Sequence, residues 1–151
     1  MTKTPRERWA TGAMCTGLGL TVLATTVPYV DRSATHLMAR HIRAAYPAYT
    51  PTRVDSAVTT YLVLSSVIGV LGVLTWLGVI WAVRADMRWA RPAATAAFVL
   101  GAGVGLAGLL TKDTSGETGL PPTLGWVGMA PCLAGLLVVV LLWRRPPPRR
   151  G

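Results

Sequence analysis

The charged residues of this chain are spaced so that they leave long uncharged segments between them. Four windows contain no Asp, Glu, Lys or Arg: residues 9–30, 56–83, 92–111 and 118–143, with lengths of 22, 28, 20 and 26 residues. A helix needs roughly 20 mainly apolar residues to cross the hydrocarbon layer of a membrane. The sequence therefore predicts an all-α, polytopic membrane protein built as a bundle of four transmembrane helices.

A soluble fold would have to bury all four runs in one core. The charged fraction is 14%, well below the roughly 25% of ordinary soluble domains. We therefore interpret residues 1–151 as a single membrane domain with a basic, proline-rich tail at 144–151.

Prolines indicate where the helices begin. The sequence TPRE at 4–7 has the pattern of a capping box with proline at the first helical position, and TP at 50–51 repeats its first half. RP at 91–92 and PP at 121–122 occupy the other two starts. The predicted helices cover about 5–29, 51–84, 92–110 and 122–143, and their membrane spans about 9–29, 57–83, 92–110 and 122–143.

Lys and Arg are divided unequally between the two predicted faces of the membrane. One face has ten (Lys3, Arg6, Arg8, Arg84, Arg88, Arg91, Arg144, Arg145, Arg149 and Arg150) and the other has five (Arg32, Arg40, Arg43, Arg53 and Lys112). The positive-inside rule then places both termini in the cytoplasm, and we expect a bacterial cytoplasmic (inner) membrane. The net charge of +9 is expected to meet anionic lipid headgroups at the cytoplasmic face. We expect no nucleic-acid partner, because no folded cytoplasmic module exists to shape a basic groove.

Residues 33–45 separate the first two windows and have the pattern of an amphipathic helix. Its predicted apolar face comprises Ala34, Leu37, Met38, His41, Ile42 and Ala45, and the opposite face Arg32, His36, Arg40 and Arg43. Such a helix would lie flat on the outer face, over the bundle or along the lipid interface.

His41 is the candidate catalytic residue of this segment. It lies on the predicted inward face, where Asp31, Asp55 or Asp113 from neighbouring loops could make it an acid or base; the alternative is a structural histidine at the interface. His36 and His41 lie about 140° apart on a helix, so they cannot chelate one ion together. We therefore expect no metal site and no cofactor.

Small residues mark faces where helices can approach closely. They are Ala97, Gly101 and Gly105 on the third predicted helix, Gly69 and Gly72 on the second, and Gly128 on the fourth. They indicate either packing inside the bundle or a groove that receives a helix of another subunit or a lipid tail. Tryptophans towards both ends of the helices have the distribution of aromatic belts.

No charged residue lies inside the windows, which disfavours a proton-coupled transporter, since such proteins hold a titrating group there. The polar groups of the first window are threonine hydroxyls, which can bond to the preceding helical turn. Cys15 and Cys132 form no C-x-x-C pair and lie at different predicted depths, so a disulfide or thiol redox site is not expected.

In layout, residues 5–145 resemble small bacterial four-helix membrane proteins, including the DoxX-like group. The resemblance covers the hydropathy profile and the loops HIRAAYPAYTPTRVDSAVTTYL and KDTSGETGLPPTLGWVGMAPCLAGL. It implies a four-helix membrane fold and transfers no catalytic residue.

Three functions fit these patterns. We expect an integral membrane protein that acts through helix packing, as an accessory or scaffold subunit of a larger membrane complex or as a homo-oligomer, without a catalytic site. The alternatives are an envelope enzyme that uses outer-loop His and Asp residues on a lipid or hydrophobic substrate, and a small-molecule permease without a buried titrating residue.

Overall fold

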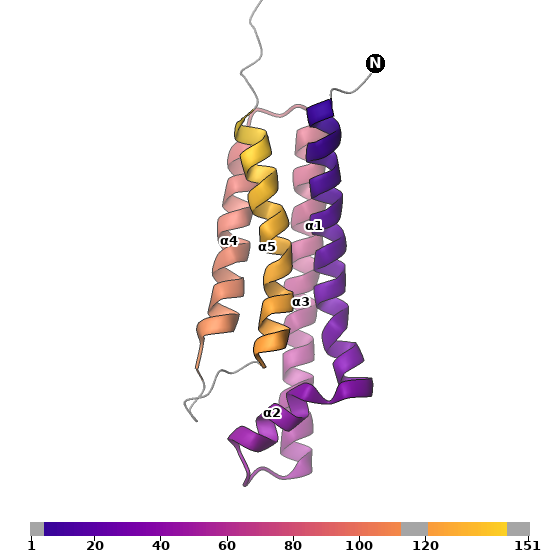
Figure 1. Ribbon diagram of the computed structural model, residues 1–151, viewed down its shortest axis with the longest axis vertical. Coiled ribbons are helices and arrows are strands. Elements are labelled where there is room, and N and C mark those ends of the chain that lie inside the picture. Colours follow the sequence, from indigo (N-terminus) through magenta and orange to yellow (C-terminus); the bar gives the residue numbers. More distant parts are fainter. Residues whose placement is uncertain (1–4, 113–120, 145–151) are drawn as a thin grey trace, which may run out of the picture.

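The computed structural model describes residues 5–112 and 121–144 of the chain. Its elements are α1 (Pro5–Val30), a π-helical turn η1 (Asp31–Thr35), α2 (Leu37–Ala45), α3 (Pro51–Arg84), α4 (Ala90–Leu110) and α5 (Pro122–Trp143). The four long helices follow the long axis of the molecule, and the short α2 lies across one end (Figure 1). We call this the α2 end; α1 begins and α5 ends at the opposite, terminal end.

The predicted limits of the four long helices are confirmed to within two residues. Thr50 caps α3 as predicted, since its side chain accepts the backbone N–H of Arg53 at 3.4 Å and Pro51 occupies the first helical position. α4 begins at Ala90, two residues before its predicted start. Pro92 is tolerated there because the first backbone N–H groups of a helix have no partner within it. Thr4 lies outside the described residues.

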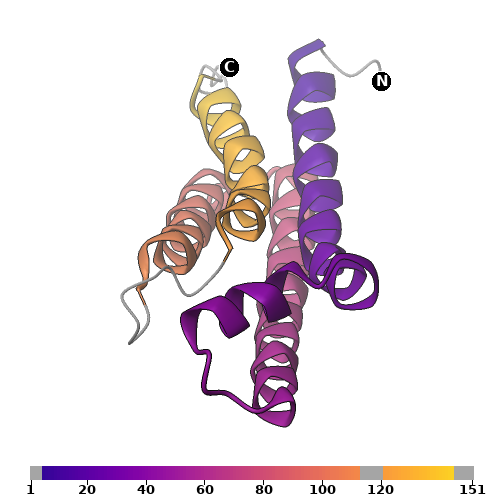
Figure 2. The same cartoon turned by 60° about the horizontal axis from the view of Figure 1, so that its bottom comes forward.

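The helices form an open arrangement in which α1 and α5 pack against each other, α3 packs on α1, and α4 packs on α5 (Figures 1 and 2). α3 and α4 contact each other far less. A buried cluster in the terminal half joins all four helices through Ala13, Met14, Val79, Ala94, Val138 and Leu142. The buried cluster at the α2 end includes no described residue of α4, so the flank of α4 that meets α3 in the terminal half loses this partner towards the α2 end.

Gly17 allows α1 and α3 to approach closely, because the ring of Trp76 occupies the space where a Cβ would lie. The Trp76 Nε1–H donates to Thr21 Oγ1 at 3.0 Å, and the Thr21 hydroxyl donates to the Gly17 carbonyl at 2.9 Å. One tryptophan thus satisfies its polar group and fills the gap between the helices.

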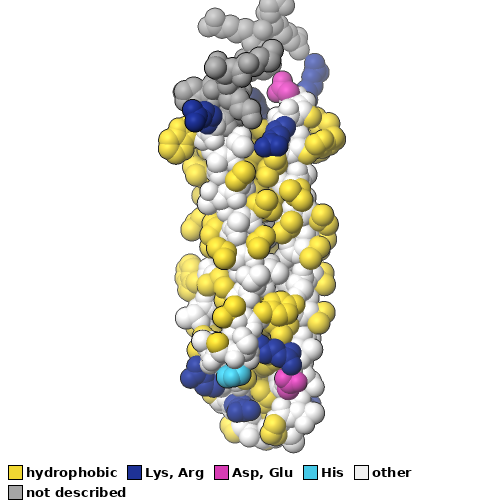
Figure 3. All heavy atoms as spheres, turned by 90° about the vertical axis from the view of Figure 1, so that its right-hand side faces the viewer, with side chains coloured by type: hydrophobic (Ala, Val, Ile, Leu, Met, Phe, Trp, Pro, Cys, Tyr) yellow, Lys and Arg dark blue, Asp and Glu magenta, His cyan; other side chains and the backbone are white. Residues whose placement is uncertain are grey.

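Apolar side chains cover the outside of the bundle. Only 6 to 22% of the residues in the apolar window of each long helix are buried, which is the reverse of a soluble bundle. On the face shown in Figure 3, charged side chains gather at the two ends and hydrophobic ones lie between them. All four long helices are long and apolar enough to cross a membrane.

Candidate functional site

The junction between α1 and α2 is organised by Asp31. Its carboxylate accepts the backbone N–H groups of Leu37 (2.8 Å) and Met38 (3.0 Å), and also the Thr35 hydroxyl. His36, with φ of 51°, adopts the left-handed conformation that turns the chain between η1 and α2. Asp31 is only 5% exposed. It supplies the hydrogen-bond acceptor for the first N–H groups of α2, because the side chain of the N-cap residue His36 makes no capping bond.

This junction shortens the predicted helix. The helix expected over 33–45 begins at Leu37, and the residues before it form the π-helical turn. The cause is the carboxylate six positions upstream of Leu37, which accepts the N–H groups where a new helix must begin. Ala34, expected on the apolar face, is consequently exposed in the turn.

Two side chains attach α2 to the bundle. Met38 and Ile42, one helical turn apart, are 7% and 8% exposed. They belong to a buried cluster with Val54, Val58, Leu62 and Leu124. Fully burying a side chain of this size is worth about 1.5–3 kcal/mol, which makes these two contacts the main attachment of α2.

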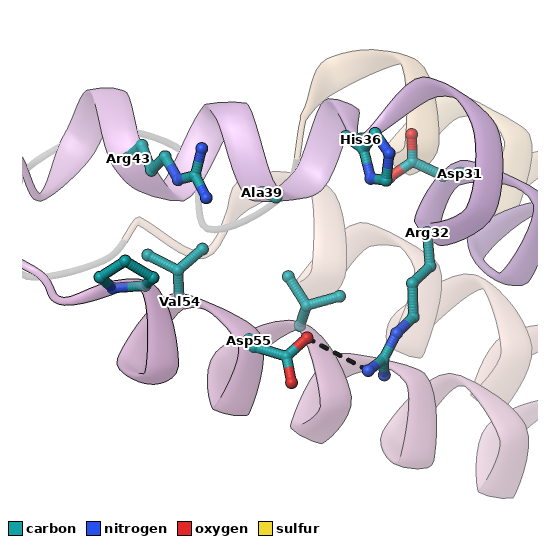
Figure 4. A pocket seen from close by; sticks show the side chains of 9 residues that line it. Asp31, Arg32, His36, Ala39, Arg43, Val54 and Asp55 are labelled. Atoms are coloured by element: carbon teal, nitrogen blue, oxygen red, sulfur yellow. Dashed lines mark hydrogen bonds and ion pairs between the residues drawn. The ribbon is translucent and has the colours of Figure 1, made fainter.

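A partly enclosed cleft of about 200 Å³ lies between the η1–α2 segment and α3. It is lined by Asp31, Arg32, His36, Ala39, Arg43, Pro51, Val54, Asp55 and Val58. Figure 4 shows Arg43 and His36 on the α2 side of this α2–α3 cleft, with Val54 and Asp55 opposite them.

The charges of the α2–α3 cleft are partly paired. Arg32 donates to Asp55 Oδ1 at 3.1 Å and to Thr59 Oγ1 at 3.0 Å (Figure 4). The Asp31 carboxylate is committed to the start of α2. Arg43 has no hydrogen bond or ion pair with any other part of the chain that the structure describes. Among the described residues, Arg43 is thus the cationic side chain of the cleft without a partner.

Of the four residues proposed as a catalytic group, the structure brings two together. Asp31 and Asp55 both line the α2–α3 cleft, whereas His41 is half-buried and does not line it. Asp113 falls outside the described residues. The histidine beside these carboxylates is His36, which the sequence assigned to the opposite face of the helix.

Arg43 and His36 share the polar face that the sequence predicts for this segment. Together with Ala39 they follow the i, i+3, i+7 pattern, which places them on one side of a helix. Whether α3 lies beside this side of α2 depends on the path of the chain from 46 to 50. Along that path the Tyr46 and Tyr49 rings stack with their centroids 4.6 Å apart, and the Arg53 guanidinium lies 4.8 Å from the centroid of the Tyr49 ring. Spacing within α2 carries no information on that path.

The residues predicted for helix packing fall into two groups: some lie in close contact with a neighbouring helix, and others have open space beside them. A Cβ added at Gly105 would lie 2.5 Å from Met129 Sδ, and one at Gly72 would lie 2.9 Å from Thr21 Cγ2; Gly69 faces Thr25 equally closely. Ala97 packs half-buried against the terminal cluster. In contrast, a Cβ at Gly101 or Gly128 would meet no described atom within 4 Å.

Four of the five threonines of α1 are used within the protein. Thr16, Thr21, Thr25 and Thr26 each donate to a carbonyl of the preceding turn, which confirms the predicted bonding. Thr21 and Thr25 also fill the space beside Gly72 and Gly69 of α3. These hydroxyls therefore serve packing and offer little support for a polar path through the bundle.

The remaining reactive side chains are dispersed. Cys15 is exposed, Cys132 is half-buried, and both are free thiols. Within residues 5–112 and 121–144, no three His, Cys, Asp or Glu side chains are grouped so that they could hold a metal ion. In the α2–α3 cleft, hydrogen bonds hold Asp31 and Arg32, whereas Arg43 is exposed and has no partner among the described residues.

Comparison with known proteins gives no further assignment: no protein family, curated protein or solved structure matches this chain.

Proposed function

We propose that this chain is a multi-pass protein of a bacterial cytoplasmic membrane, with both termini in the cytoplasm and α2 as an amphipathic helix on the outer face. Four apolar helices with charges gathered at the two ends support the membrane assignment. Exposed tryptophans at the terminal end (Trp9, Trp81, Trp89 and Trp143) and Trp126 near the α2 end support placement of both ends at membrane interfaces. The excess of Lys and Arg supports the orientation.

Within that membrane, the protein acts through helix packing, as a scaffold or accessory subunit or as a homo-oligomer. The observation that carries this proposal is the flank of α4 that contains Gly101. In the terminal half, Ala94 of this flank belongs to the buried cluster that joins all four helices, and Ala97 packs against that cluster. Further along, Gly101 is exposed and has open space at its Cβ. A small residue on an apolar, unpartnered flank allows another transmembrane helix to approach closely.

Leucine substitutions at three glycines of α4 test this proposal. Gly105→Leu should lower the melting temperature of the isolated protein in detergent, because overpacking against Met129 typically costs about 1–3 kcal/mol. Gly101→Leu should leave that temperature unchanged and should weaken association in native membranes, measured by cross-linking from a cysteine introduced at position 104, where Val104 is 48% exposed one turn from Gly101. Gly103→Leu is the matched control, since Gly103 is equally open but lies about 200° further around the helix.

The identity of the cross-linked product distinguishes the two forms of the proposal. A product of twice the chain mass indicates a homo-oligomer, and a product with a different protein indicates an accessory subunit. If Gly101→Leu and Gly103→Leu associate like the parent, this flank of α4 faces lipid and the helix-packing function is rejected.

A further inference from the structure

The α2–α3 cleft contains a positive charge that has no partner within residues 5–112 and 121–144. Arg32 is engaged by Asp55 and Thr59, and Asp31 is engaged by the start of α2. Arg43 lines the same cleft with no hydrogen bond or ion pair inside the described part of the chain. Its guanidinium therefore presents a planar set of N–H donors to whatever enters.

The shape of the cleft limits the size of its ligand. Ala39 lies between His36 and Arg43 on one side of α2, and its small side chain leaves room above Val54 and Val58 of α3 (Figure 4). The volume of about 200 Å³ is smaller than the roughly 300–1,000 Å³ of sites for drug-sized ligands. A polar headgroup fits this space, and a whole lipid does not.

We propose that the α2–α3 cleft binds a phosphate group, with Arg43 as its principal ligand. Arginine matches the oxygen geometry of phosphate and can donate two parallel hydrogen bonds to it. His36, just before the start of α2, adds a ring N–H donor to the lining. Val54 and Val58 complete the apolar part of the lining, but they are 2% and 6% exposed and leave a ligand little apolar surface to contact.

Both carboxylates of the cleft already have partners inside the protein. Asp55 is paired with Arg32, and Asp31 accepts the backbone N–H groups of Leu37 and Met38, so Arg43 is the charged group of the lining without a partner in the described part of the chain. Phosphate is available from two sources, a phospholipid headgroup and free phosphate in solution. The lipid source rests on the proposed membrane placement, in which the α2 end lies at headgroup level, and is independent of the helix-packing role of α4.

Binding can be measured on the full chain in an uncharged detergent by titration followed with ³¹P NMR. One titration uses sodium phosphate and the other uses dihexanoyl phosphatidylglycerol. We expect saturable binding to the parent, and Arg43→Gln should weaken it about tenfold or more, as loss of a charge-assisted pair does. Arg40→Gln removes the same charge from α2 and is the matched control, because Arg40 donates to the Thr35 carbonyl outside the cleft.

A second variant tests the location without changing any charge. Ala39→Leu should fill the cleft and abolish binding, while protease protection of residues 37–45 shows that α2 remains folded. Because Arg43 is exposed and has no bonding partner among the described residues, Arg43→Gln should retain the same protection.

The two probes separate the sources of phosphate. Equal affinity for both identifies phosphate itself as the ligand, and binding of the lipid alone identifies a headgroup with its glycerol carbons; either result supports the site. The proposal is overturned if the folded parent binds neither probe saturably, if Arg43→Gln and Arg40→Gln weaken binding equally, or if Ala39→Leu binds like the parent. None of these outcomes affects the result expected for Gly101→Leu.

Discussion

Asp31 and Asp55 line the same cleft but have different structural roles. Asp31 is buried and accepts two backbone N–H groups, which become unsatisfied donors when the carboxylate is removed. The side chain of Asp55 is 66% exposed and is paired with Arg32 on the surface. Exposed ion pairs contribute little because water and salt screen them. The conformation of the α1–α2 junction therefore depends on Asp31 much more than on Asp55.

We predict that Asp31→Ala lowers the free energy of unfolding by about 1–2 kcal/mol, the range for loss of a helix cap. The amide protons of Leu37 and Met38 should then exchange faster with solvent. Asp55→Ala is the control and should cost less than about 1 kcal/mol. Hydrogen exchange measured by mass spectrometry on residues 31–45 checks both; equal protection in the two variants would contradict the assigned cap.

At the scale of helices, α2 is attached by one side only. Ile42 and Met38 lie in the buried cluster with α3, whereas Leu37, expected on the same apolar face, is 38% exposed. Leu37 is the first residue of α2, and its N–H and that of Met38 are held by the Asp31 carboxylate. We attribute the exposure of Leu37 to this cap, which fixes the rotation of α2 about its axis. A single turn of contact thus decides whether residues 37–45 stay docked.

Aspartate substitutions at the two positions should therefore differ. Ile42→Asp should release α2, because it loses about 1.5–3 kcal/mol of burial and places a carboxylate in an apolar cluster. Leu37→Asp should leave α2 docked, since water reaches that position. Limited proteolysis at the arginines of α2 provides the measurement, and release by Leu37→Asp alone would show that the assigned inward face is wrong.

At the scale of the whole molecule, the two ends contain different elements of the chain. The connector from α3 to α4 lies at the terminal end together with the start of α1 and the end of α5, and α2 lies at the other end (Figure 1). Four successive crossings in alternating directions return a chain to the side where it began. A membrane bundle with this topology therefore has both ends of the chain on one side. In the orientation that we propose from the Lys/Arg excess, that side faces the cytoplasm.

Labelling of single cysteines in intact cells tests this orientation. In a background with Cys15 and Cys132 replaced by serine, a membrane-impermeant maleimide should label Ala48→Cys in the loop after α2. It should not label Thr2→Cys or Ala85→Cys until the membrane is permeabilised. The reverse pattern would invert the topology, and labelling of Thr2→Cys and Ala85→Cys from different sides would contradict the four-helix crossing.

Helix identity and helix limits could be predicted from the sequence because they depend on neighbouring residues. The length of each uncharged window, the cap at Thr50 and the prolines at positions 51 and 122 act within one or two turns, and the structure begins the helices there. The threonine bonds within α1 were predictable for the same reason, since donor and acceptor are one turn apart.

Tertiary structure decided which of these residues meet. Spacing alone made Gly101 and Gly105 equivalent, but the line of contact between α4 and α5 places Met129 against Gly105 and leaves Gly101 open. Likewise, the Asp31 cap sets the rotation of α2, so that His36 and not His41 lines the cleft with Asp55. The physical reason is that contacts between helices depend on their relative rotation and crossing, which small differences in packing select and which periodicity within a single helix does not encode.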